Sequence, residues 1–114
     1  MIAGPDSPSI YTQDGQTGEE EMAETVRRQV TIVNSRGLHA RAAAKFTGTA
    51  GNFEAKIEVT RGEQTVSGLS IMGLMMLAAA PGSDIALTAA GTDANAAIDA
   101  LAELIADKFH EEDG

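Results

Sequence analysis

Residues 53–60 alternate between apolar and polar side chains. Successive side chains of a β-strand point to opposite faces, so this period of two predicts a strand with one buried face and one face in water. Strands of this kind are typical of antiparallel sheets, because parallel sheets are covered on both faces. The pattern therefore predicts an antiparallel sheet with helices packed on its buried side.

Three further strands are expected beside this one. A β-branched run at 29–33 and a second alternating segment at 85–89 predict two of them. A turn at 61–63 leads from the first strand into the last, at 64–67. The sheet is therefore predicted to have four strands.

Three segments have helical patterns. The small residues from Ala40 onward favour a helix that ends at residues 51 and 52. The short apolar segment 71–77 is ambiguous between strand and helix, but its Met and Leu content and Ser70, a favoured N-cap residue in front of it, favour a short helix. The third helix follows residues 91–93, which are expected to cap it. Its apolar stripe is formed by Ile98, Leu101, Ala102, Ile105 and Phe109. The predicted fold class is α+β, in the order β-α-β-β-α-β-α.

Residues 1–26 differ from the rest of the chain. They contain six of the 17 acidic residues and none of the eight lysines and arginines. They show no apolar period, so ordering them would cost entropy with little burial in return. We therefore expect an acidic disordered tail at 1–26 and one domain at 27–114, with Met22 as a candidate start of a compact domain.

The composition argues against several functional classes. With a net charge of −9 and few clustered cations, the chain is a poor partner for nucleic acid. It has no cysteine, which rules out disulfides and thiolate metal sites and fits a reducing cytoplasm. The longest apolar run, at 71–81, is too short to span a bilayer, and the N-terminus lacks a signal-peptide pattern. A cytoplasmic protein that binds neither nucleic acid nor membrane is expected.

His39 stands at the junction between a predicted strand and a predicted helix. It follows Gly37, which permits a close backbone approach, and it precedes Arg41 by two residues. A helix start offers free backbone N–H groups and the positive end of the helix dipole, which together hold anions. We therefore predict that His39 carries a phosphoryl group, and that the N–H groups of Ala40 and Arg41 and the Arg41 guanidinium bind its oxygens.

Other interpretations of the histidines stay open. A lone histidine is usually structural or solvated. Residues 111–114 are interpreted as a frayed acidic end, and His110 beside them as solvated. No second metal-ligating residue stands at a suitable spacing from His39, so no metal or cofactor is expected. An enzyme with His39 as general base lacks a recognisable second catalytic group. A regulatory binding module that docks partners without carrying phosphate is the remaining alternative.

Two segments of the chain resemble a known family. Residues 37–41 (Gly-Leu-His-Ala-Arg) and 70–73 (Ser-Ile-Met-Gly), at this separation, are similar to the histidine-containing phosphocarrier (HPr) family of the bacterial phosphoenolpyruvate-dependent phosphotransferase system. The resemblance covers residues 28–109 and includes the order of elements. Ala42 replaces the proline usual in the family. Such versions resemble the α-proteobacterial branch, which often serves a nitrogen-type regulatory phosphorelay.

The resemblance implies a fold and a chemistry. The fold is an open-faced β-sandwich, a four-stranded antiparallel sheet covered on one side by three helices. The resemblance implies that the protein is a monomeric, stoichiometric carrier rather than an enzyme. It also implies that His39 accepts phosphate on Nδ1 from phospho-Enzyme I and passes it to a IIA-type acceptor, and that Arg41 offsets the phosphate charge. Whether the relay serves sugar transport or nitrogen regulation stays open.

The resemblance also implies roles for the segment after residue 69. Ser70 resembles the serine that an HPr kinase/phosphorylase modifies in part of the family, which makes it a candidate regulatory site. Ile71, Met72 and Met75 are expected to be exposed and to dock partners, because methionine is flexible and polarizable. Leu74 and Leu77 are expected inside. The alternative function is a docking module controlled by Ser70 phosphorylation rather than by phosphate carriage.

Overall fold

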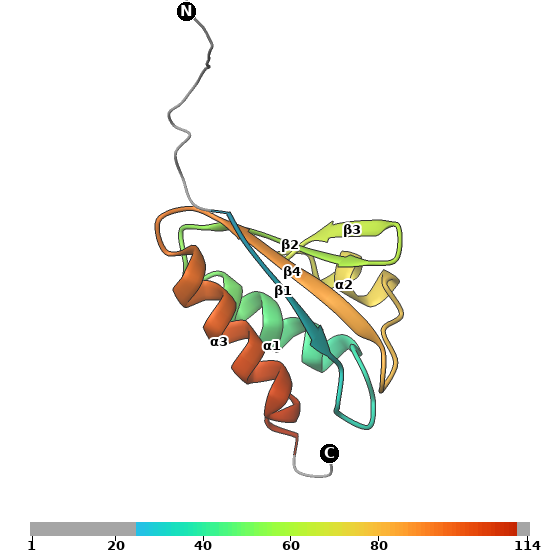
Figure 1. Ribbon diagram of the computed structural model, residues 1–114. Coiled ribbons are helices and arrows are strands. Elements are labelled where there is room, and N and C mark those ends of the chain that lie inside the picture. Colours follow the sequence, from blue (N-terminus) through green and yellow to red (C-terminus); the bar gives the residue numbers. More distant parts are fainter. Residues whose placement is uncertain (1–24, 112–114) are drawn as a thin grey trace, which may run out of the picture.

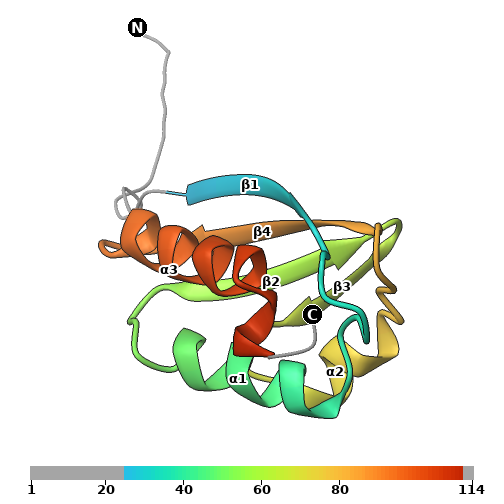
Figure 2. The same ribbon diagram turned by 90° about the horizontal axis from the view of Figure 1, so that it is seen from below.

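The computed structural model describes residues 25–111. A four-stranded antiparallel sheet carries three helices on one face (Figure 1, Figure 2). The strands are β1 (Thr25–Thr31), β2 (Lys56–Arg61), β3 (Gln64–Ser67) and β4 (Asp84–Ala90), in the spatial order β1-β4-β2-β3. The helices are α1 (Ala40–Ala50), α2 (Ile71–Met76) and α3 (Ala94–Ala106), and a short 3-10 turn, η1 (Lys108–His110), follows α3. The predicted fold class is confirmed. Residues 1–24 of the predicted tail lie outside the described residues, whereas its last two, Thr25 and Val26, form the start of β1.

The sheet has one apolar and one polar face. Its central strand, β4, pairs with β1 on one side and β2 on the other. Ile57 and Val59 of β2 and Leu87 of β4 are buried toward the helices. The register places Thr88 between Arg27 and Glu58, and these three residues form a polar row across the outer face. The alternation along the strands thus encodes a single helix-covered face, as expected.

The bounds of two strands differ from the prediction. β1 was expected at 29–33, but it begins at Thr25 and ends at Thr31, because its first residues pair with the end of β4. Ile32 leaves the strand but is completely buried, and its N–H donates to the Ser83 carbonyl at 2.8 Å. The strand predicted from residue 53 begins at Lys56.

Asp93 explains the late start of β2. It stands at the N-cap position of α3, as expected, but its side chain does not cap that helix. Its carboxylate instead accepts hydrogen bonds from the N–H groups of Glu54 and Ala55, each at 2.8 Å. Gly91 permits this approach, since its φ is +149° and a Cβ there would lie 2.8 Å from the Ala55 Cα.

The end of α3 departs from the predicted apolar stripe. Leu104 is buried although it was not predicted, whereas Ala102 is only partly buried. The helix ends at Ala106, so Phe109 reaches the core from η1 instead of from α3. Residues 108–110 all have left-handed backbone, with φ values of 57°, 55° and 62°. This turn redirects the chain toward the start of α1 (Figure 2).

No helix within residues 25–111 combines the length and the apolar character needed to cross a bilayer.

Candidate functional site

His39 is the N-cap residue of α1. Its backbone is extended, with φ −85° and ψ −178°, and its carbonyl accepts the N–H of Ala43 at 2.8 Å. Its side chain does not cap the helix. The N–H groups of Ala40 and Arg41 accordingly have no hydrogen-bond acceptor within residues 25–111. The predicted position of His39, beside free N–H groups at a helix start, is confirmed.

The loop before His39 is held by the segment that follows α2. Leu38 is buried, and its N–H donates to the Ala79 carbonyl at 2.9 Å. Gly37 has a φ of +68°, and a Cβ there would lie only 2.5 Å from the same carbonyl oxygen. Only glycine fits this position without strain, so the predicted close approach is confirmed.

Glu111 contacts His39 in a way that sequence reasoning did not find. One carboxylate oxygen, Oε2, lies within hydrogen-bond distance of Nε2 of His39. Both carboxylate oxygens also accept from Nδ2 of Asn34, at 3.2 Å each. The interpretation of residues 111–114 as a frayed end is therefore wrong for Glu111. An acidic residue beyond the last apolar position carries no local signal of such a contact.

The surroundings of Glu111 favour its ionised form. The hydrogen bond with His39 lowers the pKa of Glu111 below its ordinary value of 4.5, against an opposing effect of desolvation. The hydrogen bond from Asn34 and the positive charge of Arg36 lower this pKa as well. The carboxylate therefore acts as a hydrogen-bond acceptor only.

His39 borders an open cavity of about 380 Å³ with several cationic groups in its wall. The wall is formed by Ser35, Arg36, His39, Arg41, Lys45, His110 and Glu111. The ammonium of Lys45 is engaged with the Phe109 carbonyl at 2.6 Å. Arg41 is exposed and makes no hydrogen bond or ion pair within the described residues, so its guanidinium is available to an anion beside His39.

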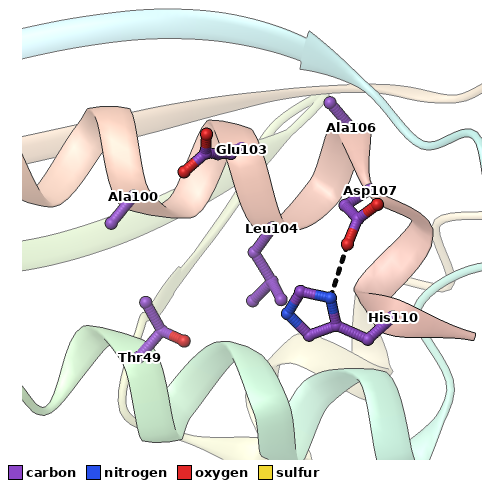
Figure 3. A pocket seen from close by; sticks show the side chains of 7 residues that line it. All are labelled: Thr49, Ala100, Glu103, Leu104, Ala106, Asp107 and His110. Atoms are coloured by element: carbon purple, nitrogen blue, oxygen red, sulfur yellow. Dashed lines mark hydrogen bonds and ion pairs between the residues drawn. The ribbon is translucent and has the colours of Figure 1, made fainter.

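His110 has a different environment. Its side chain is 62% exposed, and Nδ1 pairs with the Asp107 carboxylate at 2.5 Å. Figure 3 shows the ring beside Leu104, over the groove between α1 and α3 that Thr49 also lines. The expected exposure is confirmed, while the ion pair with Asp107 was not predicted.

Ser70 caps α2. Its Oγ accepts the N–H of Gly73 at 2.9 Å, as predicted. Gly73 packs closely, since a Cβ there would lie 3.0 Å from Ser70 Oγ and from the Val66 Cβ. Arg61 braces the other end of α2, where its Nη1 donates to the Leu77 carbonyl at 3.1 Å. A short helix is thus held at both ends.

Large apolar side chains gather on the exposed side of α2. Leu74 and Leu77 are buried, as expected. The expected docking residues are exposed, to 41% for Ile71, 69% for Met72 and 39% for Met75. Leu69 and Met76, which were not predicted, are also exposed. We name this surface the α2 patch; it comprises Leu69, Ile71, Met72, Met75 and Met76.

Residues 26–107 match a family model described as "PTS HPr component phosphorylation site". The chain is 49% identical to phosphocarrier protein HPr of Cupriavidus necator over 86 residues, which cover 75% of this chain and 97% of the relative. It is 46% identical to phosphocarrier protein NPr of Shewanella violacea, over 75% of this chain and 94% of the relative.

Solved structures agree with these relatives. The fold superimposes on the crystal structure of HPr-C-His from Thermoanaerobacter tengcongensis with a TM-score of 0.73 and 42% identity, over 76% of this chain and 98% of the other. A phosphocarrier protein HPr from Bacillus anthracis gives a TM-score of 0.69 and 41% identity, over 71% and 96% of the two chains.

Proposed function

Because the chain belongs to the HPr family of phosphotransferase-system phosphocarrier proteins, we propose that His39 is the residue that accepts and passes on the phosphoryl group. One observation carries this assignment. His39 stands at the N-cap of α1 beside the unpaired N–H groups of Ala40 and Arg41, at the wall of an open cationic cavity. His110 is paired with Asp107 and has no free helix start beside it.

The reaction is a reversible exchange between two histidines. Neutral His39 attacks the phosphorus of a phosphohistidine on an Enzyme I-type donor through Nδ1. The bond between phosphorus and the donor nitrogen breaks, and its electron pair returns to the donor ring. A second exchange of the same kind moves the phosphoryl group to a IIA-type acceptor. The protein acts as a stoichiometric carrier in this scheme, and not as an independent catalyst.

The helix start supplies the charge stabilisation. The N–H groups of Ala40 and Arg41 bind phosphate oxygens, and the Arg41 guanidinium adds a charge-assisted hydrogen bond. Transfer between two proteins depends mainly on positioning and on charge, so docking is part of the mechanism. The α2 patch offers the donor and the acceptor an apolar surface rich in methionine, a side chain suited to several partners.

Ser70 gives the patch a point of control. Its hydroxyl is part-buried beside Ile71 and Met72, so phosphate added by an HPr kinase-type partner would place about two negative charges at the edge of the α2 patch. A docking role controlled by Ser70 alone, without phosphate carriage, is the second candidate function. The exposed patch favours it, and the labelling experiment separates it from carriage.

The test is acid-labile labelling with Enzyme I, Mg²⁺ and labelled phosphoenolpyruvate. Wild type and His110→Ala are expected to take up one label, and His39→Ala none. Undiminished labelling of His39→Ala would refute the assignment. An unlabelled wild type that still binds partners through the α2 patch would favour the docking role.

A further inference from the structure

We propose that Glu111 is a positioning residue for phosphoryl transfer: it accepts the Nε2–H of His39, leaves Nδ1 with the free electron pair, and stabilises the charge that the ring gains when Nδ1 bonds phosphorus. The proposal rests on the proposed function of His39. It starts from the contact between Oε2 of Glu111 and Nε2 of His39.

Asn34 determines which atom donates in this contact. It is completely buried, and its Nδ2 donates to the Gly37 carbonyl at 2.8 Å and to both carboxylate oxygens of Glu111 at 3.2 Å. The reverse amide orientation would place its oxygen against these three acceptors. Glu111 therefore accepts from Asn34, and because its pKa is lowered it is ionised and has no proton to give. The hydrogen between Nε2 and Oε2 belongs to the ring, and a neutral imidazole then has its lone pair on Nδ1.

The carboxylate is fixed in place from several sides. The Glu111 side chain is only 13% exposed, and Asn34 donates a hydrogen bond to its carboxylate. Buried Phe109 anchors the left-handed turn before it, and Lys45 binds the carbonyl of Phe109. An orienting carboxylate fixed in this way has the same physical role as the aspartate that holds a catalytic histidine in a Ser-His-Asp triad.

The charge balance shows what Glu111 contributes to transfer. When Nδ1 bonds phosphorus and Nε2 keeps its proton, the ring becomes a cation. The negative charge of Glu111 stabilises this cation, and a cationic imidazole leaves phosphorus more readily than a neutral one. The carried group therefore stays transferable. The other charged or titratable groups at this cavity are Arg36, Arg41, Lys45 and His110.

The experiment compares Glu111→Gln with Glu103→Gln. Glutamine keeps the size of the side chain but removes its charge. Glu103 is an exposed carboxylate of α3 and does not line the His39 cavity, which makes it a matched control. The first readout is the nitrogen-15 NMR spectrum of the His39 ring, before and after phosphorylation and as a function of pH. The second is the rate of transfer from Enzyme I and to a IIA acceptor.

In Glu111→Gln we expect changed Nε2 signals before and after phosphorylation, and transfer slowed roughly tenfold. Glu103→Gln should match wild type. Wild-type signals and rates in Glu111→Gln would overturn the proposal while leaving phosphate on His39 intact. Failure of wild type to take phosphate would instead refute the proposed function, and the spectrum of the unphosphorylated ring would still test the contact with Glu111.

Discussion

The ammonium of Lys45 donates to the backbone carbonyl of Phe109 at 2.6 Å, and thereby ties α1 to the turn that carries Glu111. His39 begins the same helix, so the histidine and its carboxylate partner are both held by α1. The bond joins residues 64 positions apart in the chain. Together with the contacts of Glu111 with Asn34 and His39, it connects the two ends of the domain at the site.

Lys45→Met tests this connection. Methionine keeps most of the aliphatic stem but cannot donate, so the cost should be about 1.5–3 kcal/mol of unfolding free energy, the range for a hydrogen bond with a charged partner. Amide hydrogen exchange at residues 108–111 should accelerate more than exchange in β4. Unchanged exchange at 108–111 would show that the Lys45 hydrogen bond does not hold the turn.

Arg41→Ala should slow transfer without weakening the fold. The side chain is exposed and has no partner within the described residues, so the melting temperature should stay within a few degrees. Loss of one charge-assisted contact to phosphate predicts a cost of about 1.5–3 kcal/mol, or one to two decades in rate if the contact forms mainly in the transition state. Arg27→Ala, on the outer face of the sheet, is the matched control. Equal rates for both variants would remove Arg41 from the site.

Ser70→Asp should fold normally but accept phosphate from Enzyme I more slowly at sub-saturating concentration. A negative charge is tolerated at a helix start, yet at the edge of the α2 patch it repels an acidic partner surface. Ser70→Ala should lose about 1 kcal/mol of capping and still carry phosphate. Transfer kinetics and thermal melts check both variants. If Ser70→Asp is as fast as wild type, the regulatory role has no support.

Asp93→Ala should destabilise the domain by about 1.5–3 kcal/mol, because two backbone N–H groups lose a charged acceptor. The site lies at the far end of α1 from this contact (Figure 1), so phosphate acceptance should persist in the folded fraction. Chemical denaturation measures the first effect and labelling at low temperature the second. A variant as stable as wild type would mean that the carboxylate is not needed to shape the entry into β2.

Stability should depend on pH through Glu111. Its pKa is lowered in the folded protein, so it stabilises the fold fully above its ordinary value of 4.5 and loses this contribution as the pH falls through the folded value. The difference in melting temperature between wild type and Glu111→Gln should therefore shrink as the pH falls below 4.5. A constant difference across this range would contradict the linkage.

Local patterns predicted most of the fold. The alternation in β2 and β4, the turn at Gly62 and the Ser70 cap are each properties of neighbouring residues, and the structure confirms them. The position of His39 at the start of α1 was predictable for the same reason. Residues 25–28 were not predicted as strand because the charged side chains of Arg27 and Arg28 interrupt the apolar pattern. Their strand conformation depends on pairing with β4, which lies far away in the sequence.

The rest depends on contacts between distant segments. Glu111 reaches His39 only because residues 108–110 take left-handed backbone, a choice imposed by burial of Phe109 and by Lys45. Likewise, the Asp93 carboxylate accepts a hydrogen bond from a loop residue 38 positions away instead of capping its own helix. The residues near Glu111 and Asp93 in the sequence give no signal that predicts either contact. The chemical roles of His39 and Arg41 stay predictions.

The polar row of Arg27, Thr88 and Glu58 lies on the side of the sheet that no helix of the described residues covers. Because the chain contains no cysteine, Gln29→Cys on this bare face would create a unique thiol for a fluorescent dye. The dye would sit across the sheet from α1 and α2. Association with other molecules could then be followed through the fluorescence anisotropy of the dye, which reports how fast the labelled protein tumbles. Every group near His39 would keep its native chemistry.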